Sequence, residues 1–278
     1  MVTLMRQFMA ALIAVMVFPS LGVAQAQAAT PDCEQVRAKY QCPAEKKKIT
    51  LSFDDGVADV TPKILDILKR ERIQGTFFIL GNKVDCRLYT NDCRSNPQSQ
   101  QCQSFQLCQQ RRQTLARIKR EGHMIGSHSY EHDRHSQIPL AQAKAHILKS
   151  REVLAPYFTT EPAIFRLPYG DGWFNQKAKP QVMELLKRYQ FEHIGWEMTA
   201  YDWNEDYQRG DKILDNVMTQ MCSGKGRVGV VLFHDGVFEN EHIGRTFTAN
   251  NLGRWIPSMR CAADFVPLNY FKKNLRVK

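Results

Sequence analysis

Apolar runs and amphipathic segments alternate along the chain from residue 49 onward. Short runs rich in β-branched and aromatic residues predict buried strands at 49–53, 76–80, 124–126, 164–166, 193–196, 228–233 and 264–268. Segments with apolar residues at helical spacing follow these runs and predict helices from Thr61 onward and over 114–121, 140–154, 180–189, 212–221 and 249–263. Repeated strand-then-helix units are typical of a parallel sheet or barrel. We therefore expect an α/β fold built as one domain over residues 29–278.

Residues 1–28 have the pattern of a signal peptide. A basic residue precedes an apolar run over 8–23, and a small-x-small pattern then predicts cleavage after Ala26 or Ala28. The alternative is an uncleaved membrane anchor, but Pro19 interrupts the run, which is also shorter than the roughly 20 residues that a span needs. We expect an exported protein, secreted or periplasmic, with no stable membrane insertion after cleavage.

The chain has eight cysteines, all beyond residue 28, and an even number in an exported chain predicts four disulfides. None are spaced as Cys-x-x-Cys, which argues against a zinc ribbon or a thioredoxin-like redox site. We expect Cys33 to pair with Cys42, and Cys222 with Cys261. The other four lie in a polar segment, which we interpret as an insertion over approximately residues 84–112 that disulfides stabilise because it cannot form its own core. These four pair among themselves, with three connectivities open, and they are Cys86, Cys93, Cys102 and Cys108.

Two adjacent carboxylates, Asp54 and Asp55, follow the first predicted strand. In parallel α/β folds, functional groups collect at the carboxyl ends of strands. Because side chains alternate along a strand, we expect the two carboxylates to point in opposite directions and to serve different partners. The alternative interpretation is a plain turn, since Asp-Gly pairs are common in turns and Gly56 comes next.

Two histidines follow the third predicted strand, His128 and His132. On one turn of helix, this spacing lets both imidazoles bind one ion. A set of two histidines and one aspartate is a familiar ligand set of catalytic zinc, with an open position for water. The sequence therefore predicts a metal site near the paired aspartates.

Three more strand ends bring polar or aromatic groups to the same edge. Arg166 begins the segment Arg-Leu-Pro-Tyr-Gly, and Asp202 and Trp203 follow the next predicted strand. His234 ends the most apolar strand, a position that favours an acid or base over a core histidine.

These segments resemble the polysaccharide deacetylases, also known as the NodB-homology group or carbohydrate esterase family 4. Five motifs of that family occur in order between Thr50 and Asp235. Thr50–Gly56 is similar to the first motif and the His128-Ser-x-x-His132 segment to the second. The segment from Arg166 to Gly170 is similar to the third motif, and Leu232–His234 to the fifth. The series covers most of the chain and is far more specific than any single motif.

The resemblance implies a distorted (β/α) barrel that removes acetyl groups from the amino sugars of a glycan. It implies that a divalent metal, zinc first with cobalt or nickel as alternatives, is held by Asp55, His128 and His132. Asp54 would be the general base, held in place by Arg166, and His234 the general acid. The Tyr169 backbone N–H would help to stabilise the oxyanion. Two tryptophans and a tyrosine are candidate substrate contacts, with simple packing as the alternative for the first: Trp173, Trp203 and Tyr169.

One position departs from the family pattern. The fourth motif usually reads Asp-x-x-Asp-Trp, and its first aspartate, taken to orient the acid histidine, is Thr199 here. A carboxylate partner raises the pKa of a histidine more than a hydroxyl does. The neighbouring carboxylates that could take over this role are Glu197, Asp202 and Asp235, and Asp202 is our candidate.

The chain carries 38 Lys+Arg against 28 Asp+Glu, a formal net charge of +10. Loss of residues 1–28 would leave +9, because this segment contains one arginine and no acid. An anionic polymer such as peptidoglycan suits this charge better than neutral chitin. Nucleic acid is excluded as a partner by export, by the predicted disulfides and by the scattering of the charge. Neither a Gly-x-Ser-x-Gly elbow nor a phosphate-binding loop of the Gly-x-x-x-x-Gly-Lys type is present.

Three hypotheses follow from the sequence. The first is a metal-dependent hydrolase that removes N-acetyl groups from N-acetylglucosamine units of peptidoglycan or chitin oligosaccharides. The second is an O-acetyl esterase that acts on acetylated xylan with the same site. The third is a weakly active or non-catalytic glycan-binding relative, which Thr199 keeps open although the other motif residues are retained.

Overall fold

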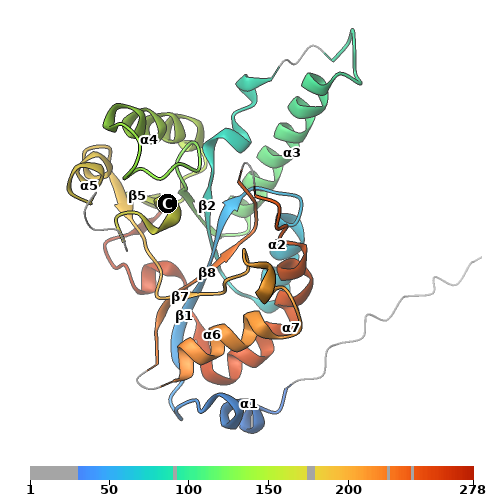
Figure 1. Cartoon of the computed structure of the whole chain (residues 1–278), viewed down its shortest axis with the longest axis vertical. Helices are drawn as coiled ribbons and strands as arrows, with labels where there is room; N and C mark the ends of the chain where they lie inside the picture. Colours follow the sequence, from blue (N-terminus) through green and yellow to red (C-terminus); the bar gives the residue numbers. More distant parts are fainter. Residues whose placement is uncertain (1–30, 90–92, 174–178, 224–225, 239–240) are drawn as a thin grey trace, which may run out of the picture.

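The fold is known from a computed structural model, which describes residues 31–89, 93–173, 179–223, 226–238 and 241–278. Its centre is a parallel sheet of eight strands in the order β6-β5-β3-β2-β1-β8-β7, with β9 paired to the beginning of β1 (Figure 1). The strands are β1 Lys47–Gly56, β2 Thr76–Ile79, β3 Met124–Ser127, β5 Ala163–Phe165, β6 Phe191–His193, β7 Met198–Thr199, β8 Gly229–His234 and β9 Ala263–Phe265. Because β6 and β7 end the strand order, the barrel is distorted and open between them, which confirms the expected fold class.

Seven α-helices pack around this sheet in the part of the chain that the structure describes, and Figure 1 shows most of them on its outside. They are α1 Cys33–Tyr40, α2 Thr61–Glu71, α3 Gln100–Arg120, α4 Leu140–Leu154, α5 Lys179–Arg188, α6 Lys212–Cys222 and α7 Thr246–Ala262. A small antiparallel pair joins β4 Thr160–Glu161 to β10 Arg276–Val277. Helix α2 shows the expected local chemistry, with Pro62 in its first turn and its buried face formed by Ile64, Leu65 and Leu68.

The core lies between the sheet and these helices. Phe53 on β1 stacks on Phe77 of β2 and on Phe233 of β8, with ring centroids 5.0 and 5.9 Å apart. These three rings are fully buried on the central strands, and burial of such large side chains is the main favourable term in folding. The central strands therefore form a rigid base for the residues at their carboxyl ends.

Some elements differ from the sequence-based prediction. The strand expected at 193–196 lies at Phe191–His193, and the last strand at Ala263–Phe265 instead of 264–268. Helix α1 was not predicted, because it has no buried residue and hence no apolar face to detect. Helix α3 begins at Gln100 instead of Thr114. Its first half is polar apart from Phe105 and Leu107, and the buried, disulfide-bonded Cys102 and Cys108 anchor it.

The prediction of four disulfides is confirmed, but half of the pairing is wrong. Cys33 pairs with Cys261, and Cys42 with Cys222, not Cys33 with Cys42 and Cys222 with Cys261. The reason is α1, whose eight residues at about 1.5 Å each separate the two N-terminal cysteines by more than the roughly 7 Å that a disulfide tolerates. The pairing of the middle four among themselves is confirmed, as Cys86–Cys108 and Cys93–Cys102.

The predicted signal peptide, residues 1–28, lies outside the described residues. Among the helices that the structure describes, none is both long and apolar enough to cross a membrane. The boundaries of the catalytic domain and of the insertion remain predictions.

Candidate active site

The end of β1 places both aspartates in one cavity. The pairing of β1 with β2 shifts register between Asp54 and Gly56, and Asp55 has φ of 66°, a left-handed conformation. This break in the strand cancels the usual alternation, so the expectation that the two carboxylates point in opposite directions is wrong. Gly236 packs against the same bend, where a Cβ would lie 2.0 Å from the Asp55 carbonyl oxygen.

The loop after β3 carries the two histidines. The spacing of the two histidines suggested a helical turn, but the segment from His128 to His132 is not helical, and Ser129 has φ of 75°. Backbone N–H groups of Gly81 and Asn82 donate to the carbonyls of Ser129 and Tyr130 at 2.9 and 3.0 Å. The loop geometry therefore depends on contacts with the neighbouring strand end.

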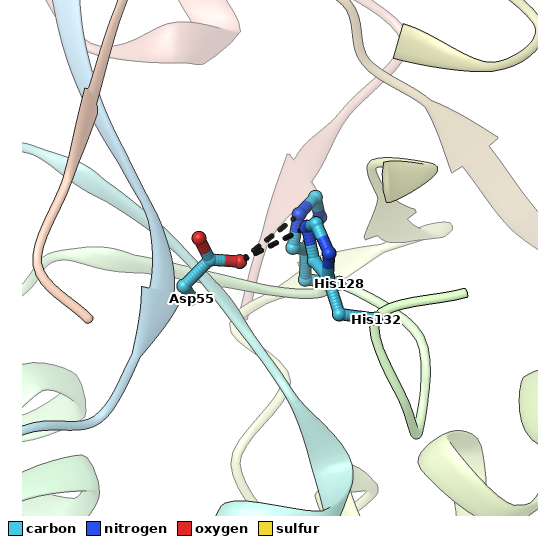
Figure 2. A group of neighbouring side chains, drawn as sticks. All are labelled: Asp55, His128 and His132. Carbon is cyan, nitrogen blue, oxygen red and sulfur yellow. Dashed lines mark ion pairs between the residues drawn. The ribbon is translucent and has the colours of Figure 1, made fainter. Parts of the chain in front are cut away.

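Asp55 and the two histidines converge on one point, as Figure 2 shows. Asp55 Oδ1 lies 3.4 Å from His128 Nε2 and 3.3 Å from His132 Nε2, and one ligand atom from each residue lies within 4.8 Å of the others. Asp55 Oδ1 is buried and accepts no hydrogen bond within the described part of the chain. An orphaned carboxylate oxygen facing two imidazole nitrogens fits a divalent cation.

Both histidines are held in the neutral form that a metal requires. His128 Nδ1 donates to the Arg166 carbonyl oxygen at 2.8 Å, which leaves Nε2 unprotonated and facing Asp55. Burial, with the Arg166 guanidinium second, lowers the pKa of His128 well below its usual value. Burial also lowers the pKa of His132 to about 2, and the nearby His128 adds to this. Burial raises the pKa of Asp55 to about 7, a cost that a bound cation would remove.

Asp54 lies beside this triad and is fixed by a buried arginine. Arg166 Nη1 donates to Asp54 Oδ1 at 2.7 Å and to Ser52 Oγ at 2.9 Å. The other donors of this fully buried guanidinium bind the carbonyls of Ile194 and Gly195. Burial raises the pKa of Asp54, although Arg166 opposes the shift, so the carboxylate is a better proton acceptor than a solvated one.

His234 lies opposite Asp54, because β1 and β8 pair with these two residues in register. Its Nδ1 donates to Asp202 Oδ1 at 2.7 Å, while Asp202 Oδ2 accepts from the His234 backbone N–H at 2.9 Å and from Thr248 at 3.2 Å. Burial alone would lower the pKa of His234, but the Asp202 carboxylate outweighs it and raises the pKa to about 9. The imidazolium therefore persists at neutral pH. Of the three candidate carboxylates, Asp202 is the one in contact with the histidine.

A cavity of about 490 Å³ joins these groups. The predicted site residues on its wall are Asp54, Asp55, His128, His132, Tyr169, Trp203 and His234. Arg166 and Asp202 lie buried behind the wall, and Trp173 lines a neighbouring cavity instead. Tyr169, with φ of 57°, places its ring 4.5 Å from that of His132.

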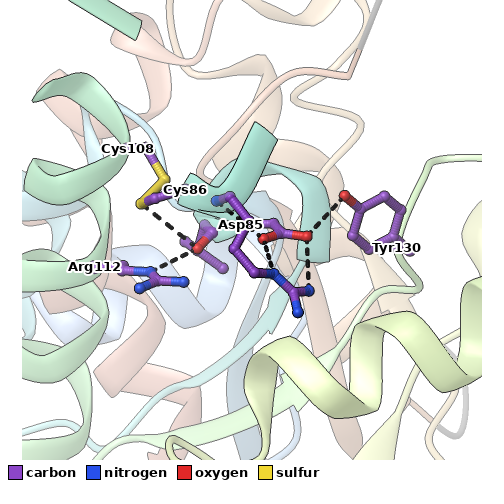
Figure 3. Close-up of a disulfide and its surroundings, with 7 residues drawn as sticks. Asp85, Cys86, Cys108, Arg112 and Tyr130 are labelled. Atoms are coloured by element: carbon purple, nitrogen blue, oxygen red, sulfur yellow. Dashed lines mark hydrogen bonds and ion pairs between the residues drawn. A yellow bond between two sulfur atoms is a disulfide. The ribbon is translucent and has the colours of Figure 1, made fainter. Parts of the chain in front are cut away.

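Sequence reasoning missed a link between the disulfide insertion and the histidine loop (Figure 3). Buried Asp85 accepts two hydrogen bonds from the Arg87 guanidinium, at 2.7 and 3.0 Å, and one from the Tyr130 hydroxyl at 3.1 Å. Asp85 directly precedes Cys86, which is bonded to Cys108, and Tyr130 lies between the two histidines of the triad, His128 and His132. The Tyr between the two histidines was visible in the sequence, but its partner was not.

Sequence reasoning also missed part of the cavity wall. Phe238 stacks on His132 with centroids 4.1 Å apart, and Arg245 pairs with Glu241 at the same wall. These residues follow the last motif in a segment with no apolar periodicity, so no sequence signal pointed to them.

Comparison with known proteins gives consistent matches. The family model described as polysaccharide deacetylase matches residues 41–193. The peptidoglycan-N-acetylglucosamine deacetylase of Bacillus cereus is 27% identical over 202 residues, 72% of this chain and 60% of that protein. The peptidoglycan-N-acetylmuramic acid deacetylase PdaC of Bacillus subtilis is 28% identical over 192 residues, 68% of this chain and 32% of that protein. The chain thus spans less than two thirds of either relative.

A solved structure extends the match. The Bc1960 peptidoglycan N-acetylglucosamine deacetylase, in complex with an N-hydroxybenzamide, aligns with a TM-score of 0.57 at 26% identity, covering 84% of this chain and 93% of that one. The family-model match includes Asp54, Asp55 and both histidines of the triad, while Asp202 and His234 lie beyond it.

Proposed function

Because the chain belongs to the polysaccharide deacetylase family, we propose that it is a metal-dependent hydrolase that removes N-acetyl groups from N-acetylglucosamine units of a glycan, either peptidoglycan or chitin oligosaccharides. The observation that supports this most is the combination of three elements in one cavity. These are an Asp-His-His triad, an arginine-held carboxylate and a carboxylate-held histidine. The names of the relatives favour an amide of peptidoglycan over other acetylated glycans.

The triad of Asp55, His128 and His132 would hold the cation, with zinc the first candidate and cobalt or nickel the alternatives. When bound, such a cation supplies Lewis-acid activation of water and of a carbonyl group. With only three protein ligands, such a cation would keep a position free for water, as catalytic zinc sites do, and all three residues line the cavity.

The chain's own residues divide the proton transfers between them. Asp54 accepts a proton from the attacking water, and Arg166 keeps the carboxylate aimed at the cavity. His234 engages Asp202 through Nδ1, which leaves Nε2–H to protonate the leaving amine nitrogen. The Tyr169 backbone N–H is the proposed donor to the oxyanion, and Trp203, 44% exposed at the cavity, is a proposed sugar contact.

We also propose that the protein is exported, to a periplasm or outside the cell, with a glycan as its partner and no nucleic acid. The four disulfides within the described residues support an oxidising compartment.

An acetate-release assay tests the function directly. Chitin oligomers, peptidoglycan and acetylated xylan are incubated with the protein, with and without a chelator. We expect release from peptidoglycan or chitin oligomers, abolished by the chelator and by Asp54→Asn. Release from acetylated xylan alone would favour the O-acetyl esterase, and release that persists in Asp54→Asn would refute the assigned base. Binding of glycans without release from any of them would favour the non-catalytic relative.

A further inference from the structure

A second cavity, which the proposed mechanism does not use, adjoins the active-site cavity. Its volume is about 640 Å³, and it shares Trp196, Thr199 and Tyr201 with its neighbour. The other residues used below are Trp173, Glu197, Asn216 and Arg227. We call this cavity the lateral groove. We propose that the lateral groove binds a second sugar unit of the same glycan chain, beside the unit that carries the acetyl group; this inference rests on the proposed function.

The groove lies at the open seam of the barrel. Strand β7 pairs with β8 and strand β6 with β5, and the segment that joins β6 to β7 lines the groove. His234 ends β8 at the active site, whereas Arg227 and Val228 precede the start of that strand. The groove therefore leads from the active site toward the opposite end of β8. A path of this kind suits a polymer that continues beyond the reacting unit.

Trp173 provides a fixed aromatic surface in the groove. Its indole N–H donates to the Trp196 carbonyl oxygen at 3.0 Å, and the ring lies against Gly195, where a Cβ would be 2.2 Å from indole Cδ2. The side chain is nevertheless 37% exposed. The C–H face of a sugar ring stacks on the negative face of such a ring, and because the indole is already immobilised, binding costs little conformational entropy.

Polar atoms in the groove match sugar hydroxyls better than an ionic group. Arg227 donates to the Glu197 carbonyl oxygen at 2.7 Å, and Glu197 Oε2 accepts from the Val230 N–H at 2.6 Å. Asn216 Nδ2 donates to the Thr199 carbonyl oxygen at 2.6 Å. These bonds orient side chains that keep further donor or acceptor atoms. With one acidic and one basic side chain, the groove has no excess charge to select an anion.

Thr199 lies where the two cavities meet. The side-chain amide of Gln220 holds the backbone of Thr199: it accepts from the Thr199 N–H at 3.2 Å and donates to the Thr199 carbonyl oxygen at 2.8 Å. The family usually has an aspartate at this position. An uncharged side chain here lets a sugar chain cross the junction without the desolvation of a carboxylate.

Chain-length dependence of acetate release tests this inference. N-Acetylglucosamine and the di- and tetrasaccharides of chitin, with the di- and tetrasaccharide fragments of peptidoglycan, are compared by kcat/KM. For the wild type we expect a rise of about tenfold from the monosaccharide to the disaccharide, which supplies the second sugar unit, equivalent to about 1.4 kcal/mol. Trp173→Ala and the groove-filling Val228→Trp should remove most of this rise, whereas Trp173→Phe should retain it.

Two aromatic controls separate the groove from general effects. Trp203→Ala, in the active-site cavity alone, should lower kcat/KM for all lengths and leave the ratio between lengths unchanged. Tyr270→Ala, at an exposed tyrosine outside both cavities, should change neither kcat/KM nor the ratio between lengths. A ratio that is unaffected by both Trp173→Ala and Val228→Trp overturns the groove while leaving the deacetylase function intact.

If no substrate releases acetate, the proposed function fails and the groove is tested by binding. Calorimetric titration of the same saccharides into the protein should then show tighter binding of the disaccharide than of the monosaccharide, a difference that is lost in Trp173→Ala. Equal affinity for both lengths in the wild type would overturn the inference.

Discussion

The charge on His234 depends on one neighbouring side chain. The family pattern directed attention to Thr199, in place of the usual aspartate, as the weak position of the site. In the structure, Thr199 instead borders the two cavities, and Asp202 contacts both the ring and the backbone of His234. The missing aspartate therefore does not deprive His234, the proposed general acid, of a carboxylate partner.

We predict that Asp202→Asn moves the alkaline limit of activity to lower pH. Because the acid must be protonated, and the pKa of His234 is raised to about 9, wild-type activity should persist through neutral pH and fall above about pH 9. Burial lowers the pKa of His234, and Asp202 is the largest of the contributions that raise it, so without the Asp202 carboxylate the alkaline limb moves to lower pH. At pH 8, kcat should fall by about 100-fold, the usual contribution of a general acid. The pH profile of kcat measures this.

Thr248→Val is the matched control for this change. It removes one donor to Asp202, at 3.2 Å, and leaves the contact between Asp202 and His234 in place. The alkaline limb should therefore stay near the wild-type pH. An unchanged limb in Asp202→Asn would show that another group sets the acid's pKa.

At the scale of elements, the histidine loop depends on the start of the disulfide insertion. Tyr130 connects the loop to Asp85, which Arg87 fixes beside Cys86 (Figure 3). Metal ligands that are held by outer contacts bind their ion more tightly than free ones. Through this contact, the start of the predicted insertion would support the proposed metal site.

We predict that Tyr130→Phe weakens zinc binding by about tenfold. This is the smaller end of the loss in metal affinity that follows when a hydrogen bond supporting the metal ligands is removed. The substitution removes the hydroxyl that binds Asp85 and keeps the ring. Competition with a chromophoric chelator measures the affinity. Glu152→Gln is the control, since it removes the other, exposed partner of Arg87 and should leave the affinity unchanged. Equal affinities for wild type and Tyr130→Phe would contradict the supporting role.

The elements also show what the sequence could predict. The central strands were predictable because they are short buried runs rich in apolar and β-branched residues, continuous in β8 and interrupted only by Thr50 and Ser52 in β1. Asp54, His128 and His234 stand at or just after the ends of these runs. Helix α1 was not predictable, because only Val36 and Tyr40 pack against the core from it and two disulfides to distant segments supplement this contact. The direction of Asp55 and the shape of the histidine loop depend on left-handed residues that are not glycine, for which the sequence has no local sign.

For the molecule as a whole, two disulfides connect the N-terminal segment to the C-terminal half. Cys33–Cys261 binds α1 to α7, and Cys42–Cys222 binds the segment after α1 to the end of α6. In Figure 1, α1 lies at the end of the molecule opposite to the cysteine-rich insertion. No side chain of α1 is fully buried, and these covalent links add to the packing of Val36 and Tyr40 against the core and to the contacts of Lys39 and Tyr40 with Asp215.

We predict that removal of Cys42–Cys222, by substitution of both cysteines with alanine, lowers the free energy of unfolding by about 2–4 kcal/mol. The bond joins residues 180 apart, so its loss greatly increases the entropy of the unfolded chain. The matched removal of Cys93–Cys102, only 9 residues apart, should cost less. Denaturant unfolding measures the free energy of unfolding of both variants. A larger decrease on removal of Cys93–Cys102 than on removal of Cys42–Cys222 would contradict the entropic explanation.

The metal site is tested most directly by titration of zinc into chelator-stripped protein while acetate release is followed. We predict that activity is absent without metal, rises with added zinc and saturates at one ion per chain. Asp55→Asn should lose both binding and activity. Glu131→Gln, in a neighbouring acidic cluster with Asp133 and His146, should keep both. Full activity in the stripped protein, or zinc binding that survives Asp55→Asn and fails in Glu131→Gln, would contradict a metal centre of Asp55, His128 and His132.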